Sequence, residues 1–178
     1  MNNNKFDIIF NKISDENHES EINLYIGDKN ICLFKSTNEK RFKTTRWNLD
    51  ELVIYLRDLY ITLYNDEPFP CEVEGECAAE LDSNARDFDT EDDLEFEKYY
   101  TALNEWGYKH SWHHACSGAI LADVFFRKVD DKIEISWWSD QDEEDVIFKY
   151  RYGFTLVSIN EFFEIVNKSV NSYNNLWL

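Results

Sequence analysis

Hydrophobic and polar residues alternate most regularly between Leu121 and Tyr152. Apolar side chains occupy every second position in two runs, at Ile133, Ile135 and Trp137 and then at Val146, Phe148, Tyr150 and Tyr152. A shorter apolar run at 124–126 precedes them, and the turn pair Asp130-Asp131 separates it from the first run. Because a period of two places successive side chains on opposite faces, we predict a three-stranded meander with one buried face and a second turn at 139–145.

The N-terminal third has the same period of two. Its apolar positions are Phe6, Ile8 and Phe10, followed by Ile22, Leu24 and Ile26. Turn-forming residues at 27–30 and a further apolar run at 31–35 come next. This pattern is typical of strands joined by a tight turn, and we predict a second β-meander here.

Three other segments have apolar residues at helical spacing instead. Their stripes lie at 49–63, 96–106 and 159–173. Asn48 and Ser158 each precede a glutamate by three residues, which is the capping-box pattern, and Thr90 is the expected N-cap of the middle helix. Gly107 is expected to end that helix in a left-handed conformation.

The element order is therefore strands, helix, acidic connector at 66–90, helix, strands, helix. It predicts an α+β fold of mostly antiparallel β-meanders, about six strands, packed with about three amphipathic helices. A length of 178 residues suits one domain, 1–178, with a sizeable core.

Composition indicates a cytoplasmic protein. No run approaches the roughly 20 apolar residues of a membrane span, and the first residues lack the apolar core of a secretory signal. We expect no membrane association. The four cysteines form no CxxC pair, so free thiols are expected.

The net charge of −18 is confined to two segments. Residues 66–97 hold 14 acidic residues and one base, Arg86, and residues 139–145 hold five more acids. The remainder has 17 acids and 17 bases and is neutral. Such local density indicates either a solvated loop or a contact surface for an electropositive partner.

We interpret these acids as a partner-binding surface made of Asp87, Asp89, Glu91, Asp92, Asp93, Glu95, Glu97, Asp140, Asp142, Glu143, Glu144 and Asp145. If 87–97 were mostly helical, its carboxylates would recur about every 2.4 Å, against about 3.4 Å for the phosphates of a DNA strand. Composition and size resemble those of the acidic immunity proteins of bacterial toxin systems and of phage-encoded nucleic-acid mimics. The charge density predicts an inhibitor that blocks the basic surface of a nuclease, CRISPR effector or toxin by imitating phosphates. Nucleic acid itself is not an expected ligand.

Two other functions stay open. His110, His113, His114 and Cys116 are close in sequence and could serve a metal-dependent hydrolase, although the glutamate of the HExxH motif is missing. The second alternative function is a regulatory or sensing module of a bacterial defence system. No glycine-rich phosphate loop or complete catalytic triad is recognisable, so we expect neither enzyme activity nor a cofactor.

Overall fold

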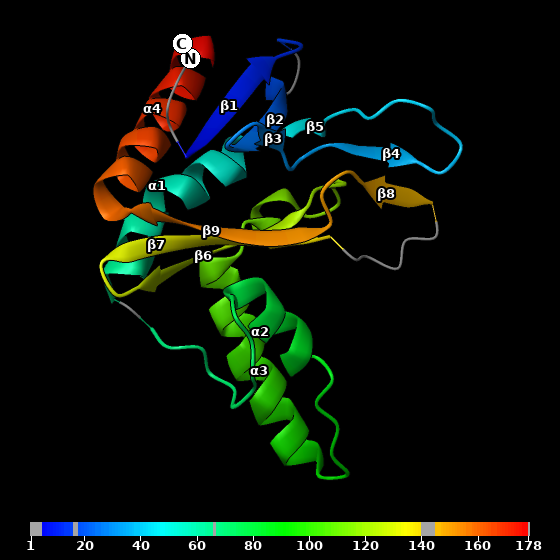
Figure 1. Cartoon of the computed structure of the whole chain (residues 1–178), viewed down its shortest axis with the longest axis vertical. Coiled ribbons are helices and arrows are strands. Elements are labelled where there is room, and N and C mark those ends of the chain that lie inside the picture. Colours follow the sequence, from blue (N-terminus) through cyan, green and yellow to red (C-terminus); the bar gives the residue numbers. More distant parts are fainter. Residues whose placement is uncertain (1–4, 16–17, 66, 140–144, 178) are drawn as a thin grey trace.

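The computed structural model describes residues 5–15, 18–65, 67–139 and 145–177 (Figure 1). In chain order the elements are β1 (Phe6–Lys12), β2 (Glu19–Ile26), β3 (Lys29–Asn30), β4 (Phe34–Ser36), β5 (Arg46–Asn48), α1 (Asp50–Asn65), α2 (Ala78–Ala85), α3 (Asp93–His110), a short 3-10 helix (His113–Cys116), β6 (Asp123–Val129), β7 (Lys132–Trp138), β8 (Val146–Phe148), β9 (Tyr152–Ser158) and α4 (Ile159–Trp177).

The fold is mixed α+β, and its strands pair antiparallel, which confirms the predicted class at that level. Within the described residues there are nine strands and four α-helices, more than the expected six and three. Short strands of two or three residues account for much of the difference. The extra helix, α2, lies inside the segment that the sequence indicated as an acidic connector.

The central sheet has the order β6-β7-β9, and its third strand was predicted wrongly. The β6–β7 hairpin turns at Asp130 and Asp131 as expected, with Asp130 at a positive φ of 54°. However, β7 pairs along its whole length with β9, while β8 pairs with β4 in a separate two-stranded sheet. The ring of Phe148 packs on Phe34 with centroids 6.1 Å apart, which holds this segment away from β7.

The N-terminal sheet has β2 in its interior, paired with β1, β3 and β5. Gly27 makes the turn after β2 with a φ of +59°, which favours glycine. The strand expected at 31–35 is shorter than predicted, because Ile31 and Cys32 instead turn into the core.

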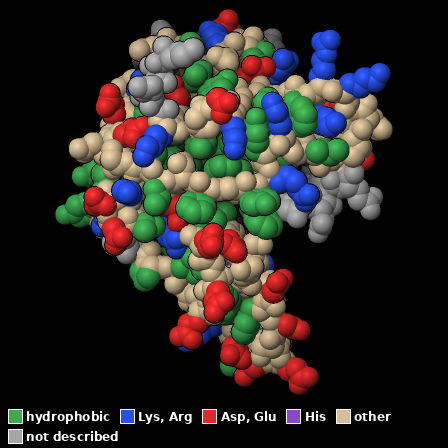
Figure 2. Space-filling model, in the orientation of Figure 1, with side chains coloured by type: hydrophobic (Ala, Val, Ile, Leu, Met, Phe, Trp, Pro, Cys, Tyr) green, Lys and Arg blue, Asp and Glu red, His purple; other side chains and the backbone are tan. Residues whose placement is uncertain are grey.

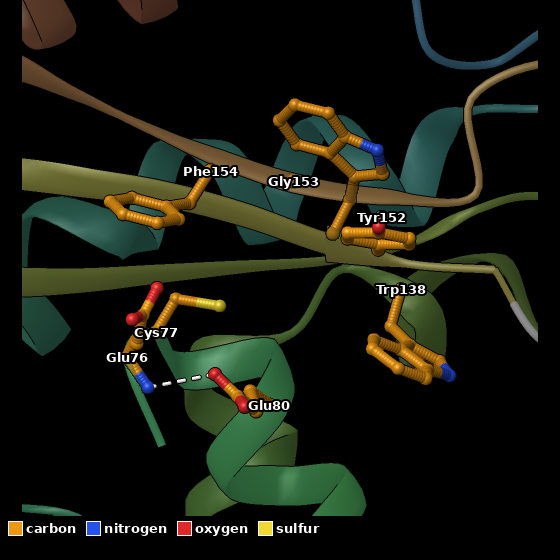
Figure 3. Close-up of a pocket in the computed structure, with 8 residues that line it drawn as sticks. Glu76, Cys77, Glu80, Trp138, Tyr152, Gly153 and Phe154 are labelled. Atoms are coloured by element: carbon orange, nitrogen blue, oxygen red, sulfur yellow. Dashed lines mark hydrogen bonds between the residues drawn. The ribbon is translucent and has the colours of Figure 1, made fainter.

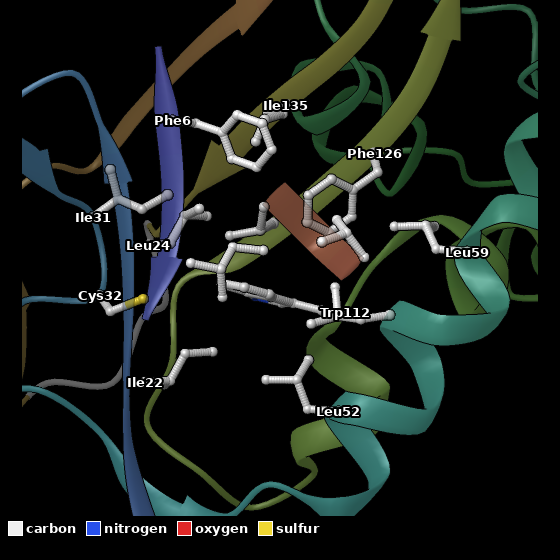
Figure 4. Packing of buried hydrophobic residues seen from close by; sticks show 14 of the residues in the cluster. Phe6, Ile22, Leu24, Ile31, Cys32, Leu52, Leu59, Trp112, Phe126 and Ile135 are labelled. Atoms are coloured by element: carbon white, nitrogen blue, oxygen red, sulfur yellow. The ribbon is translucent and has the colours of Figure 1, made fainter. Parts of the chain in front are cut away.

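The main core lies between this sheet, helices α1 and α4, and one face of the central sheet (Figure 4). Trp112 is fully buried near its middle and its indole N–H donates to the carbonyl of Ala122 at 2.8 Å. Ile135 of β7 and Phe126 of β6 point into it, while α4 packs along β1 and α1. The predicted buried face at Ile133, Ile135 and Trp137 is confirmed.

The other face of the central sheet is buried over β6 and β7, contrary to the prediction of one buried face. Helices α2 and α3 lie against β6, and α2 also lies against β7 (Figure 1). A second apolar cluster fills this contact, made of Cys77, Ala78, Ala79, Trp106 and Phe125. Glu134 and Ser136, which alternate with the core residues of β7, are therefore buried although polar.

Helix ends follow the capping predictions in part. The Ser158 hydroxyl accepts from the Glu161 amide at 3.2 Å, as expected for α4. The Asn48 side chain accepts from Asp50 at 2.8 Å rather than from Glu51, because α1 begins at Asp50. Gly107 does not end α3, since the helix continues to His110 and Ser111 is its C-cap.

None of the described helices is both long and apolar enough to cross a membrane. The four cysteines, Cys32, Cys71, Cys77 and Cys116, are free thiols.

A pair of glycine substitutions tests this packing. A methyl group at Gly153 would lie 2.5 Å from Cζ2 of Trp137 on the adjacent strand, so Gly153→Ala should lower the free energy of unfolding by about 1–3 kcal/mol. At Gly107 the nearest atom is Nε2 of His114 at 3.8 Å, so Gly107→Ala should be neutral or stabilise α3 by up to about 1 kcal/mol. Urea unfolding measures the free energy of unfolding of both variants. Equal stability of the two variants would contradict the described position of Trp137.

Candidate functional site

Helices α2 and α3 extend from the central sheet as a narrow column, which we call the acidic projection and define as residues 78–110 (Figure 1). The N-terminal end of α3 and the preceding loop lie at its far end, here called the tip (residues 87–97). Figure 2 shows acidic side chains along the column and gathered at the tip.

The loop between α2 and α3 is fastened to α3 by aromatic side chains. The ring of Phe88 stacks on that of Tyr99 with centroids 3.9 Å apart. The hydroxyl of Tyr100 lies 2.9 Å from the carbonyl oxygen of Arg86 and 3.0 Å from that of Phe88, so it donates to this pair of acceptors. These contacts give the loop a defined conformation, unlike a chain that is merely solvated.

Asp92 is the N-cap of α3 in place of the predicted Thr90. Its carboxylate accepts from the amides of Leu94 at 2.9 Å and Glu95 at 3.1 Å. Thr90 has a supporting position, because its hydroxyl donates to the Glu95 carboxylate at 2.9 Å. The negative charges of this first turn also lie at the positive end of the helix dipole, which stabilises them locally.

The seven predicted acids of residues 87–97 are all exposed: Asp87, Asp89, Glu91, Asp92, Asp93, Glu95 and Glu97. Asp87, the first of them, lies nearer the sheet, because it lines a cavity together with Asp123. None of the seven forms an ion pair within the described chain. Arg86 does not neutralise them, since its guanidinium forms a bidentate ion pair with the Asp82 carboxylate, with N–O distances of 2.7 and 3.1 Å. Lys98 is the one basic residue in the first two turns of α3.

The predicted helical row of charges is wrong. Residues 87–92 precede the helix, and only Asp93, Glu95 and Glu97 lie in α3. At 100° per residue, Glu95 lies on the side of the helix opposite to Asp93 and Glu97. The carboxylates therefore surround the tip and do not form a line with phosphate-like spacing.

Of the acids of the second segment, 139–145, only Asp145 lies within the described residues. Asp140, Asp142, Glu143 and Glu144 lie outside the described residues. Asp145 is exposed beside the β4–β8 pair, where its carbonyl accepts from the Thr37 amide at 3.0 Å. In Figure 1 this pair extends to the side of the body, away from the tip. The structure thus does not place Asp145 on the same surface as the other acids.

The acidic projection is anchored at its root by Glu134 of β7. One carboxylate oxygen accepts from the Ala78 amide at 2.6 Å and from the Ser136 hydroxyl at 3.1 Å, and the other accepts from Arg127 at 2.6 Å. The Ser136 hydroxyl oxygen in turn accepts from the Ala79 amide at 3.1 Å. Strand β7 thus supplies the N-terminal cap of α2, which has no side-chain cap of its own.

A small cavity of about 310 Å³ lies beside this root, and its charged lining residues are Asp82, Arg86, Asp87 and Asp123. The Ser111 hydroxyl donates to the Asp123 carboxyl. Burial raises the pKa of Asp123 to about 6, against the opposing effects of this hydrogen bond and of His113. The charge of Asp82 acts in the same direction as burial.

The histidines and the cysteine considered for a metal site do not converge, although the rings of His113 and His114 meet edge to face with centroids 5.8 Å apart. His110 is buried, where its Nδ1 lies 2.8 Å from the Phe126 carbonyl and its ring stacks on Trp106. Burial lowers its pKa. His114 instead packs on Tyr108 at the surface, with ring centroids 3.9 Å apart, while Cys116 belongs to the main core. In the described part of the chain, no group of three or more His, Cys, Asp or Glu side chains could hold a metal ion.

Sequence reasoning missed helix α2 and its anchor. Ala78, Ala79 and Leu81 give α2 a short apolar side and good helix propensity, but eight residues are too few for a clear periodic signal. Glu134 and Ser136 have the pattern of a solvent-facing strand side, because their partners are amides 56 and 57 residues away.

Comparison with known proteins gave no match: no protein-family model, curated protein or solved structure is significantly similar to this chain.

Replacement of Glu134 tests the anchor. Glu134→Ala leaves the Ala78 amide and the Arg127 guanidinium without their buried acceptor, and we expect a loss of about 3–5 kcal/mol in the free energy of unfolding. Glu134→Gln keeps one acceptor oxygen and should lose less. Exposed Glu105 provides the control, since Glu105→Ala should change stability by less than about 0.5 kcal/mol. If hydrogen exchange at Ala78 and Ala79 is unchanged in Glu134→Ala, β7 does not cap α2.

A pH series tests the Asp123 environment. Since the pKa of the folded protein, about 6, exceeds the ordinary value near 3.9, the folded state retains a proton between about pH 4 and 6 that the unfolded chain has lost. Asp123 therefore lowers stability as pH rises through this window. The stability of Asp123→Asn relative to wild type should increase from pH 4 to pH 7 by on the order of 2 kcal/mol. A difference that is independent of pH would contradict the assignment.

Proposed function

We propose that this chain is an acidic binding protein of the inhibitor or immunity type, and that the tip of the acidic projection blocks a basic surface on a partner protein. The observation that carries this proposal is the set of seven exposed carboxylates of residues 87–97, which form no ion pairs within the described residues and lie on a projection that is fastened to the sheet.

The electrostatic cost of the tip supports binding over simple solvation. Like charges at this density repel one another and lower the stability of the free protein. A loop needed only for solubility has no reason to be stacked through Phe88 and hydrogen-bonded through Tyr100. A defined array of carboxylates would attract a basic partner and accelerate association at low salt, because opposed fields act over a Debye length of about 10 Å at 0.1 M.

The partner class follows from charge and shape. A narrow column with an acidic end fits a concave, basic groove of the kind that binds nucleic acid, which favours a nuclease, CRISPR effector or toxin as partner. In this proposal the encounter takes place in the cytoplasm and requires no catalysis by this chain. The carboxylates surround the tip and do not form a line. They would therefore fill the basic groove of the partner with negative charge and would not imitate the regular spacing of phosphates.

Matched charge variants test this function. The tip variant carries Asp89→Asn, Asp93→Asn and Glu97→Gln and leaves the Asp92 cap intact. The control variant carries Asp28→Asn, Asp58→Asn and Glu164→Gln, three exposed acids of the body, and has the same net charge. Basic proteins retained by immobilised wild type from an extract of the source organism are purified, and the affinity of each variant is measured at several salt concentrations.

The tip variant should bind the partner at least tenfold more weakly than wild type, about 1.4 kcal/mol, with a shallower salt dependence. The control variant should stay within about twofold of wild type, because rim charges far from the contact have small effects. The tip variant should also melt no lower than wild type, since its self-repulsion is reduced. Equal weakening by both variants would show that only net charge matters and would overturn the proposal.

A further inference from the structure

A cavity of about 440 Å³ opens beside the root of the acidic projection, between the start of α2 and the β9 edge of the central sheet (Figure 3). Its lining combines residues of strands β7 and β9 with residues around the start of α2: Trp137, Trp138, Tyr152, Gly153, Phe154, Glu76, Cys77 and Glu80. Its size is within the range of about 300–1,000 Å³ that is usual for ligand sites.

Sheet register explains the aromatic wall. Trp138 of β7 is the cross-strand partner of Tyr152, and Phe154 is the partner of Ser136, so their side chains share one face of the sheet. Helix α2 packs on β6 and β7 over this face and leaves the β9 side uncovered. Tyr152 and Phe154 are consequently 72% and 46% exposed. The centroids of the Trp138 and Tyr152 rings lie 5.8 Å apart and the ring planes are inclined by 34°. The two rings therefore form one continuous wall, with no space for a ligand between them.

The electrostatics of the cavity favour a cation. Although it lies at the start of a helix, the amides there are already occupied, those of Ala78 and Ala79 by Glu134 and Ser136 and that of Glu76 by the Glu80 carboxylate at 2.8 Å. An anion would therefore find no free donor among them. Glu76 is exposed, and Glu80 uses only one of its two carboxylate oxygens for this contact.

The Cys77 thiol at the cavity also lies near negative charges. Its pKa is raised, first by burial, with the charges of Glu134 and Glu80 acting in the same direction. Among the described residues, no lysine or arginine lines the cavity. The described lining thus combines aromatic side chains with two carboxylates, a combination that favours a cationic ligand.

We propose that this cavity binds an arginine side chain of the basic partner, with the guanidinium against the Trp138–Tyr152 wall and its N–H groups donating to Glu76 and Glu80. Arginine fits better than lysine because its planar, weakly hydrated guanidinium stacks on aromatic rings and offers several donors in one plane. The inference rests on the proposed function, since it gives the same partner a second, more specific contact beside the tip.

A small probe tests the cavity without the partner. N-acetyl-arginine N-methylamide is titrated into the 15N-labelled protein, and the Trp138 indole and the Gly153 and Phe154 amides are followed by NMR. We expect saturable shifts with a roughly millimolar dissociation constant. The citrulline analogue has nearly the same shape without the charge and should bind at least fivefold more weakly. Equal binding of citrulline, or no saturable shift with the arginine probe, would overturn the inference.

Surface variants locate the binding. Tyr152→Ala and the double change Glu76→Gln with Glu80→Gln should each weaken probe binding at least threefold. Tyr64→Ala is the matched control, because Tyr64 is 75% exposed on α1 and does not line the cavity. It should bind the probe as wild type does. Similar losses in Tyr64→Ala and Tyr152→Ala, with melting temperatures unchanged, would place the probe elsewhere and contradict the proposal.

The partner assay separates this inference from the proposed function. If the tip variant loses affinity for the partner while Tyr152→Ala does not, the proposed function stands and the arginine site is wrong. If Tyr152→Ala weakens both probe and partner while the tip variant binds normally, the cavity is the contact and the proposed role of the tip fails. Loss of affinity in both variants supports both statements.

Discussion

The buried carboxylate of Glu134 joins helix α2 to the central sheet. It accepts a hydrogen bond from the first turn of α2 and pairs with Arg127 of β6, so one side chain connects two strands and a helix. A buried charge without partners would cost several kcal/mol, and the position of α2 is therefore fixed wherever β7 is formed. The apolar contact of Trp106 with Phe125 is a second link between the acidic projection and this sheet.

This arrangement explains why the central sheet is apolar on one side and mixed on the other. The side facing α1 and α4 is filled by large aliphatic and aromatic residues such as Ile135 and Phe126. The side facing α2 contains the acceptors that a helix N-terminus needs, and small residues, Ala78 and Ala79, that allow close approach. Beyond the edge of α2, the same face continues as the aromatic wall of Tyr152 and Phe154.

The parts of the fold that sequence predicted are those with a local signal. Helices α1 and α4 follow their apolar stripes, and the β6–β7 hairpin follows its alternation and its Asp130-Asp131 turn. The choice of β9 over β8 as partner of β7 was not predictable, because both segments alternate and only tertiary packing, such as Phe148 on Phe34, separates them. The acids of the tip were identifiable by density alone, whereas their arrangement depended on where α3 begins. The cavity at Glu76 and Tyr152 needs residues from two distant segments and has no local signal.

The hydroxyl of Tyr100 has a consequence for the thermodynamics of the proposed association. Because it holds the carbonyls of Arg86 and Phe88 in the free protein, the loop loses its conformational entropy during folding and not during an encounter. A basic partner would then meet an array that needs little rearrangement, and more of the interaction free energy would remain as affinity. Differences in affinity between related partners would consequently be expressed mainly in how long each complex lasts.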